Sequence, residues 1–365
     1  MKIISKILLV LTAIILLELT CQVVFLFYDE KKYSILLKPF SDKISKLTIN
    51  DYKIDWDYKK NKMKPGIYNR KGIQYTINSK GFRGREFDLI KNKKRIITFG
   101  GSTTAGLESP DDKTYPAQLE LLLNKSGKNY EVINMGFSSK SLNFIKSLLF
   151  TEAYKYKADV IIIYSNRNSI MYDGSYVDSN LFNNKLIKIN FFLQENIMIY
   201  RLMFKVYKRY INFNLDTDYL KSPFSSKGVN EKYLLDGYKN SLIEIINFSK
   251  KNNIQVILAK QAYFFTPNII DEIDKFSVLE LIENYKKDFF LKKYSLKEGE
   301  NFFIILGAIL NKKLDELKNF ENVTVVNPIP ELIKSKSNFT DYLHLTPEGN
   351  FTLANEIYKS FDKAQ

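Results

Sequence analysis

From residue 95 onwards, short apolar runs alternate with longer stretches whose apolar residues recur at helical spacing. The runs that predict strands are Arg95 to Phe99, Tyr130 to Met135, Asp159 to Tyr164, Ile254 to Ala259 and Val323 to Val326. The stretches that predict helices are Tyr115 to Leu123, Ser141 to Tyr156, Lys232 to Lys251, Phe302 to Phe320 and Thr346 to Phe361. Because such alternation is typical of α/β proteins, we expect a five-stranded parallel sheet with right-handed crossovers.

The alternation is interrupted between residues 166 and 226. This stretch is rich in Asn, Tyr and Phe, and it predicts one helix, from Met198 to Tyr210. We interpret it as an insertion that could cover the strand ends and influence the choice of ligand.

The N-terminus carries a different pattern. Residues 7 to 28 are almost wholly apolar and approach the ~20 residues that a helix needs to cross a bilayer. Lys2 and Lys6 precede this segment, which places the N-terminus in the cytoplasm and the rest of the chain outside. A cleaved signal peptide is the alternative, but no small-x-small site follows. We therefore expect a transmembrane signal anchor at 1–28, a juxtamembrane stalk and lead-in segment at 29–92, and an α/β domain at 93–365.

Charge and cysteine content narrow the choice of partners. The formal net charge is +15, but the lysines are spread along the chain and mixed with 40 acidic residues. No basic stripe or RNA-binding signature is present, so nucleic acid is not indicated. We attribute the charge to a proteome rich in lysine, isoleucine and asparagine, with attraction to an anionic lipid surface or an acidic glycan as the alternative. Cys21 is the single cysteine, which excludes an internal disulfide and a cysteine-based metal site. We expect no metal and no cofactor.

Two distant segments carry candidate chemistry. Ser102 follows the first predicted strand, and His344, the one histidine of the chain, lies three residues after Asp341. A serine, an imidazole and a carboxylate can act as nucleophile, general base and orienting group. A phosphate-binding helix start is the alternative for Ser102, but its segment lacks the Gly-x-x-x-x-Gly-Lys pattern. The residues therefore favour hydrolysis or acyl transfer.

The candidate residues share a position relative to the predicted sheet. Four segments each follow a strand: Ser102 the first, Gly136 the second, Asn166 to Asn168 the third, and Asp341 to His344 the fifth. Ligands of parallel sheets bind beyond the carboxyl ends of the strands, so we expect these segments to meet at one edge.

Three blocks make the chain resemble the SGNH, or GDSL-like, hydrolase superfamily, and more closely its membrane-anchored bacterial members, over residues 72 to 361. The blocks are Phe99 to Gly106, Val132 to Gly136 and Asp341 to Gly349. The resemblance implies a three-layer α/β/α, flavodoxin-like fold. It also implies a catalytic triad of Ser102, His344 and Asp341, and an oxyanion hole formed by the backbone N–H groups of Ser102 and Gly136 and the side-chain amide of Asn168.

The third block departs from the family pattern Gly-x-Asn-Asp and is Asn166-Arg167-Asn168-Ser169 here. Because Asn tolerates left-handed backbone conformations, Asn166 could substitute for the missing glycine. A shift of register would instead make Asn166 the oxyanion donor. We favour Asn168 and keep Asn166 as the alternative.

Asn78 and Arg83 lie in a segment that resembles one common ahead of this domain in anchored family members. We expect these two residues to serve in packing, with pocket lining as the alternative.

The resemblance and the predicted anchor together indicate a catalytic domain in the periplasm or on the cell surface. The expected activity is that of a serine esterase or deacylase acting on O-acyl groups of a cell-envelope carbohydrate. The alternatives are an O-acyltransferase with the same triad, a lipid esterase, and a non-catalytic carbohydrate-binding or envelope assembly protein. The sequence does not indicate an oligomeric state.

Overall fold

The computed structural model describes residues 12–13, 15–20, 56–57, 62–70, 72–173, 231–264, 267–296 and 298–362. Residues 12–13 and 15–20 are helical and belong to a unit separate from that of residues 51–176 and 223–365. In the ranges just given, no helix has the length and hydrophobicity that a membrane crossing requires. Most of the predicted anchor, most of the insertion at 166–226 and the helix expected at 198–210 lie outside the described residues.

The larger unit is built on a five-stranded parallel sheet in the order β6-β5-β7-β8-β9. Its strands are β5 (Lys94–Gly100), β6 (Tyr130–Gly136), β7 (Val160–Tyr164), β8 (Gln255–Ala259) and β9 (Val323–Val326). The expected α/β fold with its five-stranded parallel sheet is confirmed, and each strand lies within about one residue of its predicted bounds.

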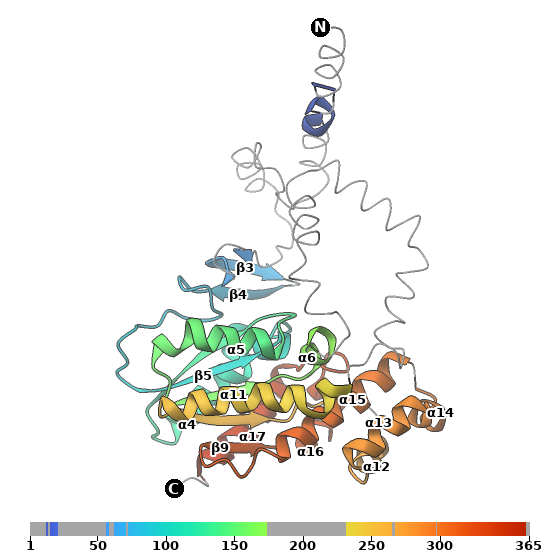
Figure 1. Ribbon diagram of the computed structural model, residues 1–365. Coiled ribbons are helices and arrows are strands. Elements are labelled where there is room, and N and C mark those ends of the chain that lie inside the picture. Colours follow the sequence, from blue (N-terminus) through green and yellow to red (C-terminus); the bar gives the residue numbers. More distant parts are fainter. Residues whose placement is uncertain are drawn as a thin grey trace. The chain divides into compact units, whose positions relative to one another are not determined.

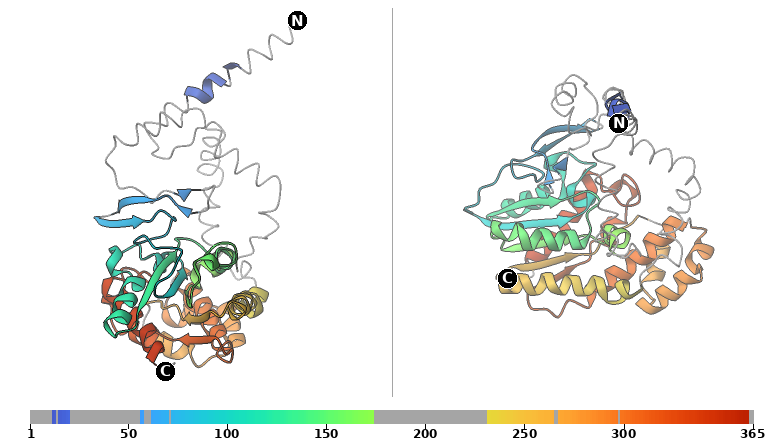
Figure 2. Two further views of the ribbon diagram at one scale, coloured as in Figure 1. Left: turned by 90° about the vertical axis from the view of Figure 1, so that its left-hand side faces the viewer. Right: turned by 45° about the horizontal axis from the view of Figure 1, so that its top comes forward.

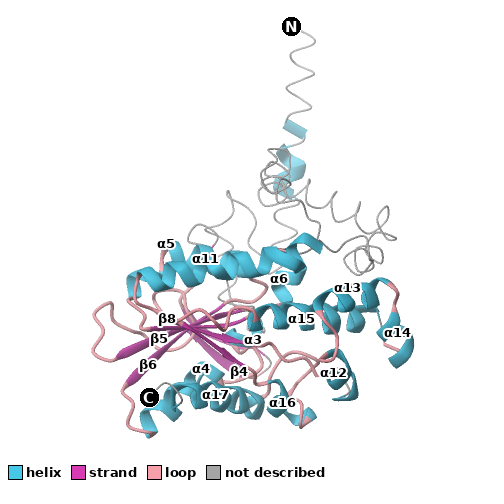
Figure 3. Cartoon of the chain, turned by 60° about the horizontal axis from the view of Figure 1, so that its bottom comes forward, coloured by secondary structure: helices cyan, strands magenta, loops and turns pink. Residues whose placement is uncertain are grey.

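Helices cover both faces of this sheet (Figure 1, Figure 3). On one face lie α5 (Leu142–Thr151), α11 (Tyr238–Lys251) and α15 (Glu298–Asp315), and on the other lie α4 (Tyr115–Lys125) and α17 (Pro347–Asp362). In β7, Ile161 and Ile163 pack in the first core, and Val160 and Ile162 pack in the second. Because successive residues of a strand point to opposite faces, this unbroken β-branched run serves both cores of a three-layer α/β/α arrangement.

The lead-in segment packs in the same unit as the sheet. It contains two antiparallel strand pairs: β1 (Trp56–Asp57) with β2 (Lys62–Met63), and β3 (Gly66–Arg70) with β4 (Ile73–Ile77). Arg83 forms backbone bridges with Ile77 and with Asn134 of β6, which joins the hairpin to the edge of the sheet (Figure 2). Phe82 and Phe87 are buried in the core next to α5.

Several elements carry no clear signal in the hydrophobic pattern. They are α3 (Ser102–Ala105), α6 (Arg167–Tyr172), α12 (Pro267–Ile273), α13 (Val278–Lys286), α14 (Phe289–Tyr294), α16 (Ile329–Leu332) and the short 3₁₀ helices η1 (Asp111–Lys113) and η4 (Lys336–Asn338). The helix expected at 141–156 is divided into α5 and the 3₁₀ helix η2 (Ala153–Tyr156), and the helix expected at 232–251 begins with the π-helical segment η3 (Tyr233–Gly237). A capping signal for α13 was nevertheless present, because Ser277 and Glu280 form a capping box at its start. The helix expected at 302–320 begins earlier, at Glu298, and ends at Asp315.

Candidate active site

Ser102 lies at the turn between β5 and α3, where two glycines make room for it. A Cβ on Gly100 would lie 2.0 Å from Thr104 Oγ1 and 2.4 Å from the carbonyl oxygen of Tyr164. A Cβ on Gly101 would lie 2.4 Å from Nδ2 of Asn168. Since real Cβ atoms do not approach so closely, the turn requires glycine at both positions, and it brings Ser102 close to the start of α6.

His344 reaches this serine from a tight loop ahead of α17. The loop closes through a hydrogen bond from the Thr340 N–H to the His344 carbonyl, 2.8 Å long. Thr346 then caps the helix by accepting the Gly349 N–H on its hydroxyl, and Pro347 is the first helical residue. The loop is thereby anchored at both ends.

The three residues of the predicted triad form one hydrogen-bonded chain. His344 Nε2 lies 2.8 Å from Ser102 Oγ, and His344 Nδ1 lies 2.7 Å from Asp341 Oδ2. The other carboxylate oxygen, Oδ1, accepts the backbone N–H groups of Leu343 and His344, each at 2.7 Å. The carboxylate is therefore fixed by three donors, and it orients the imidazole toward the serine.

The electrostatics of Asp341 favour its ionised form. Partial burial would by itself raise the pKa of this carboxyl, but the hydrogen bonds from the His344 side chain and from the two backbone N–H groups outweigh it. The net result is a pKa of about 2. Asp341 therefore remains a carboxylate at any pH at which the protein would work.

Asn168 lies beside the serine, and Asn166 does not. The Asn168 side chain is buried, contacts the position of a Gly101 Cβ, and donates to the Lys140 carbonyl at 3.0 Å. An amide carries two N–H donors, so one remains for a ligand, and Asn168 and Ser102 line the same hollow. This placement favours Asn168 over its alternative.

Asn166 is committed to a buried network on the side of α15. Its Nδ2 donates to Asn311 Oδ1 at 3.0 Å, and its Oδ1 accepts the hydroxyl of Tyr263. Its φ is −145°, so the left-handed conformation suggested as a substitute for glycine is wrong. Both polar atoms of the Asn166 side chain are therefore bound by buried partners, which are Gly307, Asn311 and Tyr263.

Gly136 is not placed as the oxyanion donor that the sequence analysis expected. Its N–H donates to Oδ1 of Asn134 at 2.9 Å. A Cβ at this position would lie 2.2 Å from the backbone nitrogen of Ala105. The glycine therefore allows α3 to approach β6, and Asn134 reinforces this contact by donating to the Thr104 carbonyl at 2.9 Å.

Gln261 is a residue of this region that the sequence analysis missed. Its Oε1 accepts the N–H groups of Asn166 and Arg167 at 3.1 and 2.9 Å, and its Nε2 donates to Thr103 at 3.2 Å. It thus connects the start of α6 to α3. A signal existed in its position, because Gln261 follows the fourth predicted strand at the same edge as the other candidate residues.

Arg83 holds the other end of the serine helix. It is buried, pairs with Asp111 at 2.9 Å, and donates to the carbonyls of Ala105, Gly106 and Ser109. Burial lowers the pKa of its guanidinium, although Asp111 acts in the opposite direction. The packing role expected for Arg83 is observed, and the atoms it contacts are those that end α3.

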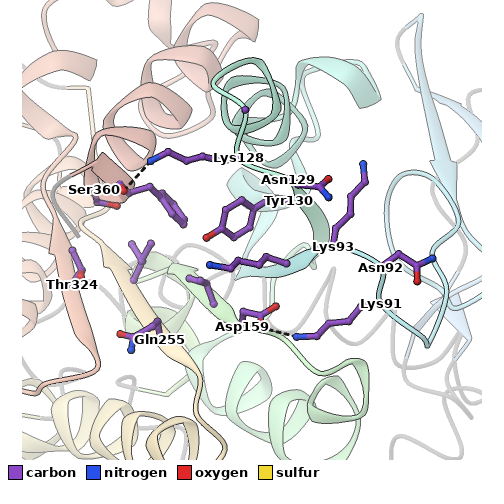
Figure 4. Close-up of a pocket in the computed structure, with 15 residues that line it drawn as sticks. Lys91, Asn92, Lys93, Lys128, Asn129, Tyr130, Asp159, Gln255, Thr324 and Ser360 are labelled. Atoms are coloured by element: carbon purple, nitrogen blue, oxygen red, sulfur yellow. Dashed lines mark hydrogen bonds and ion pairs between the residues drawn. The ribbon is translucent and has the colours of Figure 1, made fainter. Parts of the chain in front are cut away.

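Two hollows lie at opposite ends of the parallel strands, which we call the carboxyl edge and the amino edge of the sheet. The small one, at the carboxyl edge, is lined by Ser102, Arg167, Asn168 and Gln261 among others. The larger one, of about 970 Å³, lies at the amino edge, where Figure 4 shows Lys91, Lys93 and Lys128 around it. Within the described ranges, no group of three or more His, Cys, Asp or Glu side chains could hold a metal ion.

Comparisons with known proteins gave matches among solved structures alone. No family model and no curated protein sequence matches the chain. One similar structure is a GDSL-like lipase from Bacteroides thetaiotaomicron, at 13% identity and a TM-score of 0.40, covering 76% of this chain and 91% of the other. Another is an acetyl xylan esterase variant from Geobacillus stearothermophilus, at 14% identity and a TM-score of 0.40, covering 74% and 96%.

Proposed function

We propose that this chain is a serine esterase that removes O-acyl groups from a carbohydrate of the cell envelope. The observation that carries the proposal is the continuous hydrogen-bonded chain from Ser102 Oγ through His344 to Asp341. A binding protein would need none of these three residues in contact, whereas nucleophilic catalysis needs all of them.

The geometry supports a two-step reaction. Ser102 Oγ attacks the ester carbonyl carbon while its proton passes to His344 Nε2, and the tetrahedral intermediate collapses as His344 returns that proton to the departing alcohol. Water then attacks the acyl-enzyme, giving its proton to the same nitrogen, and the acid leaves as Ser102 recovers its proton. Asp341 stabilises the imidazolium that forms in each step.

The oxyanion would be stabilised by the Ser102 N–H, the Asn168 amide and a donor from the loop that follows β6. In that loop, the N–H groups of Phe137 and Lys140 are bound to the carbonyls of Gly100 and Phe137. The N–H groups of Ser138 and Ser139 have no acceptor among the described residues. Ser139 also has a φ of 59°, which turns the backbone at this point. We assign the third donor to this pair in place of Gly136.

Labelling with a fluorophosphonate probe tests the nucleophile directly. We expect the full-length protein to be labelled and Ser102→Ala not to be labelled. Ser360→Ala, which removes a hydroxyl at the amino-edge hollow, is the matched control and should be labelled like the wild type. Folded wild-type protein that resists the probe would contradict the proposal.

The acceptor distinguishes hydrolysis from acyl transfer, because both reactions share the acyl-enzyme. Turnover of an aryl acetate with and without a monosaccharide separates them: an esterase releases acetate in both cases, whereas a transferase forms the acetylated sugar. Mass spectrometry of envelope polysaccharide from cells with and without the protein then tests the substrate. Acyl groups should accumulate on the polysaccharide when the esterase is missing.

We also propose that residues 1–28 anchor the protein, with the catalytic domain outside the cytoplasm. The support is the apolar run from residue 7 to 28 and the lysines that precede it. Protease added to intact cells or spheroplasts should digest the catalytic domain, and alkaline carbonate should leave the protein in the membrane fraction. Release by carbonate would contradict the anchor.

A further inference from the structure

Arg167 differs from the other arginines whose side chains are described. Those three each pair with a carboxylate: Arg83 with Asp111, Arg85 with Glu120, and Arg95 with Glu131. No carboxylate of the described residues lies within ion-pair distance of Arg167. A half-buried guanidinium without a counterion has lost part of its hydration, which contacts with uncharged groups compensate only in part, so it gains when an anion binds.

The side chain is nevertheless held in one orientation. Nε of Arg167 donates to the Tyr342 hydroxyl at 3.0 Å, and the guanidinium carbon lies 4.5 Å from the centre of the Phe303 ring. Its backbone N–H is bound by Gln261 at 2.9 Å. Nε is thus occupied, while the two terminal nitrogens have no hydrogen-bond partner among the described residues. Those two nitrogens carry four of the five N–H donors of the planar guanidinium, the group that binds carboxylate or phosphate in a fork.

The fork lies at the proposed reaction centre. Arg167 lines the same small hollow as Ser102 and Asn168, and Tyr342, which holds it, belongs to the loop that carries His344. It occupies the variable position of the third sequence block, so the family resemblance assigns it no role. A charged group on the substrate could therefore contact Arg167 while an ester on the same molecule contacts Ser102.

We infer that Arg167 binds an anionic group, a carboxylate or a phosphate, that the substrate carries next to the ester. This inference rests on the proposed esterase function and narrows its substrate class to O-acylated acidic carbohydrates. The net charge of +15 acts in the same direction, because it attracts polyanions to the whole protein. Arg167 itself would select anionic substrates at the hollow.

The test compares three acetylated sugars that differ in charge: a methyl glucoside, a methyl glucuronoside and a glucose phosphate. Acetate release by the full-length protein should show kcat/KM about 10- to 100-fold higher for the anionic sugars. The arm that is preferred distinguishes carboxylate from phosphate. Arg167→Gln should abolish the preference, and Arg167→Lys should retain part of it as a point charge.

Two variants serve as controls for charge and for the orientation of the side chain. Arg85→Gln removes one exposed positive charge of equal size away from the hollow, and it should leave the preference unchanged. Tyr342→Phe removes the partner of Nε but keeps the cation, so the preference should survive. Equal loss of turnover for charged and neutral sugars in Arg167→Gln would overturn the inference and make Arg167 a brace for the histidine loop. A wild type without preference would overturn it as well.

Binding to Ser102→Ala separates this inference from the proposed function. Calorimetric titration of that variant with the same three sugars requires no turnover. If the wild type hydrolyses none of them, the esterase proposal fails, and tighter binding of the anionic sugars that depends on Arg167 would still support the anion site. Equal affinity for charged and neutral sugars would overturn it.

Discussion

The two edges of the central sheet each carry a buried arginine that ties loops together, but they differ in what those loops hold. Arg83, near the carboxyl edge, binds carbonyls at the end of the helix that begins with Ser102. Arg95, at the amino edge, pairs with Glu131 and binds the carbonyls of Asp88 and Tyr156. The same stabilising device therefore holds the segment of Ser102 at one edge and the loops around Asp88 and Tyr156 at the other.

The two edges also differ in the size of their hollows and in the side chains that line them. The amino edge has the larger hollow, of about 970 Å³, with lysines around it (Figure 4). The carboxyl edge has the smaller hollow, which is lined by Ser102, and the hydroxyl of this serine lies 2.8 Å from His344 Nε2. A cavity locates a reaction only where side chains that exchange a proton converge on it.

Of the variants considered, removal of the His344 imidazole should cause the largest loss of the activity that we propose for the carboxyl edge. In His344→Ala, Ser102 loses its general base, and ester turnover should fall at least ~10³-fold, because members of a triad fail together. Circular dichroism should show an unchanged fold, since the side chain is partly exposed. Turnover within about tenfold of the wild type would remove His344 from the mechanism.

The two asparagines of the third block should separate catalysis from folding. Asn168→Ala removes a proposed oxyanion donor and should lower kcat about 10²- to 10³-fold. Asn166→Ala leaves buried partners unpaired and should lower the unfolding free energy by about 1–3 kcal/mol. Both variants need kinetics and urea titration. The assignment is wrong if Asn166→Ala loses kcat with unchanged stability.

Conservative replacement of the two buried arginines compares the edges directly. Lysine cannot reproduce several carbonyl contacts and an ion pair at once, so Arg83→Lys and Arg95→Lys should both lower the melting temperature. Only Arg83→Lys should also lower kcat, by about tenfold, with KM little changed, because a displaced α3 misplaces Ser102. If Arg83→Lys and Arg95→Lys lose kcat in the same proportion to their loss of melting temperature, Arg83 is a purely structural residue.

The structure brings together the predicted residues whose side chains would take part in the proposed reaction themselves. Ser102, Asp341 and His344 are unusual by type and position, and the strand pattern placed them at one edge. The prediction of Gly136 as an oxyanion donor differs from the structure because the presence of a glycine in the sequence does not reveal the direction of its N–H. That direction depends on Asn134 and on how closely α3 approaches.

Residues that act through long-range contacts were the least predictable. Asn166 meets Tyr263 and Asn311, and Arg83 meets the end of α3, only after distant segments have packed. No local pattern encodes such a meeting. The short helices α12 and α14 likewise depend on the core that they cover, since helices of this length have little stability of their own.

A fall in pH should lower the free energy of unfolding through Asp341. The pKa of Asp341 is lowered to about 2 in the folded protein, so its stabilising effect is complete above its ordinary pKa and disappears as the pH falls toward 2. The unfolding free energy of the wild type should therefore fall more between about pH 5 and pH 2 than that of Asp341→Asn. Because the side chain is 46% exposed, the difference should be small. Parallel pH profiles of the two proteins would contradict the lowered pKa.

The smallest effect is expected from the lysines of the amino-edge hollow. Lys93 and Lys94 lie at the opposite ends of the strands from Ser102, and Lys94 lies over the Tyr130 ring with its ammonium 5.9 Å from the ring centre. Salt screens the interaction between exposed charges at one end of the strands and groups at the other end. The double variant Lys93→Ala/Lys94→Ala should therefore keep kcat/KM for a neutral ester within about twofold of the wild type. A larger loss, measured at physiological ionic strength and with an unchanged melting temperature, would show that the two edges are coupled. The larger hollow would then share in the function that we propose for the smaller one.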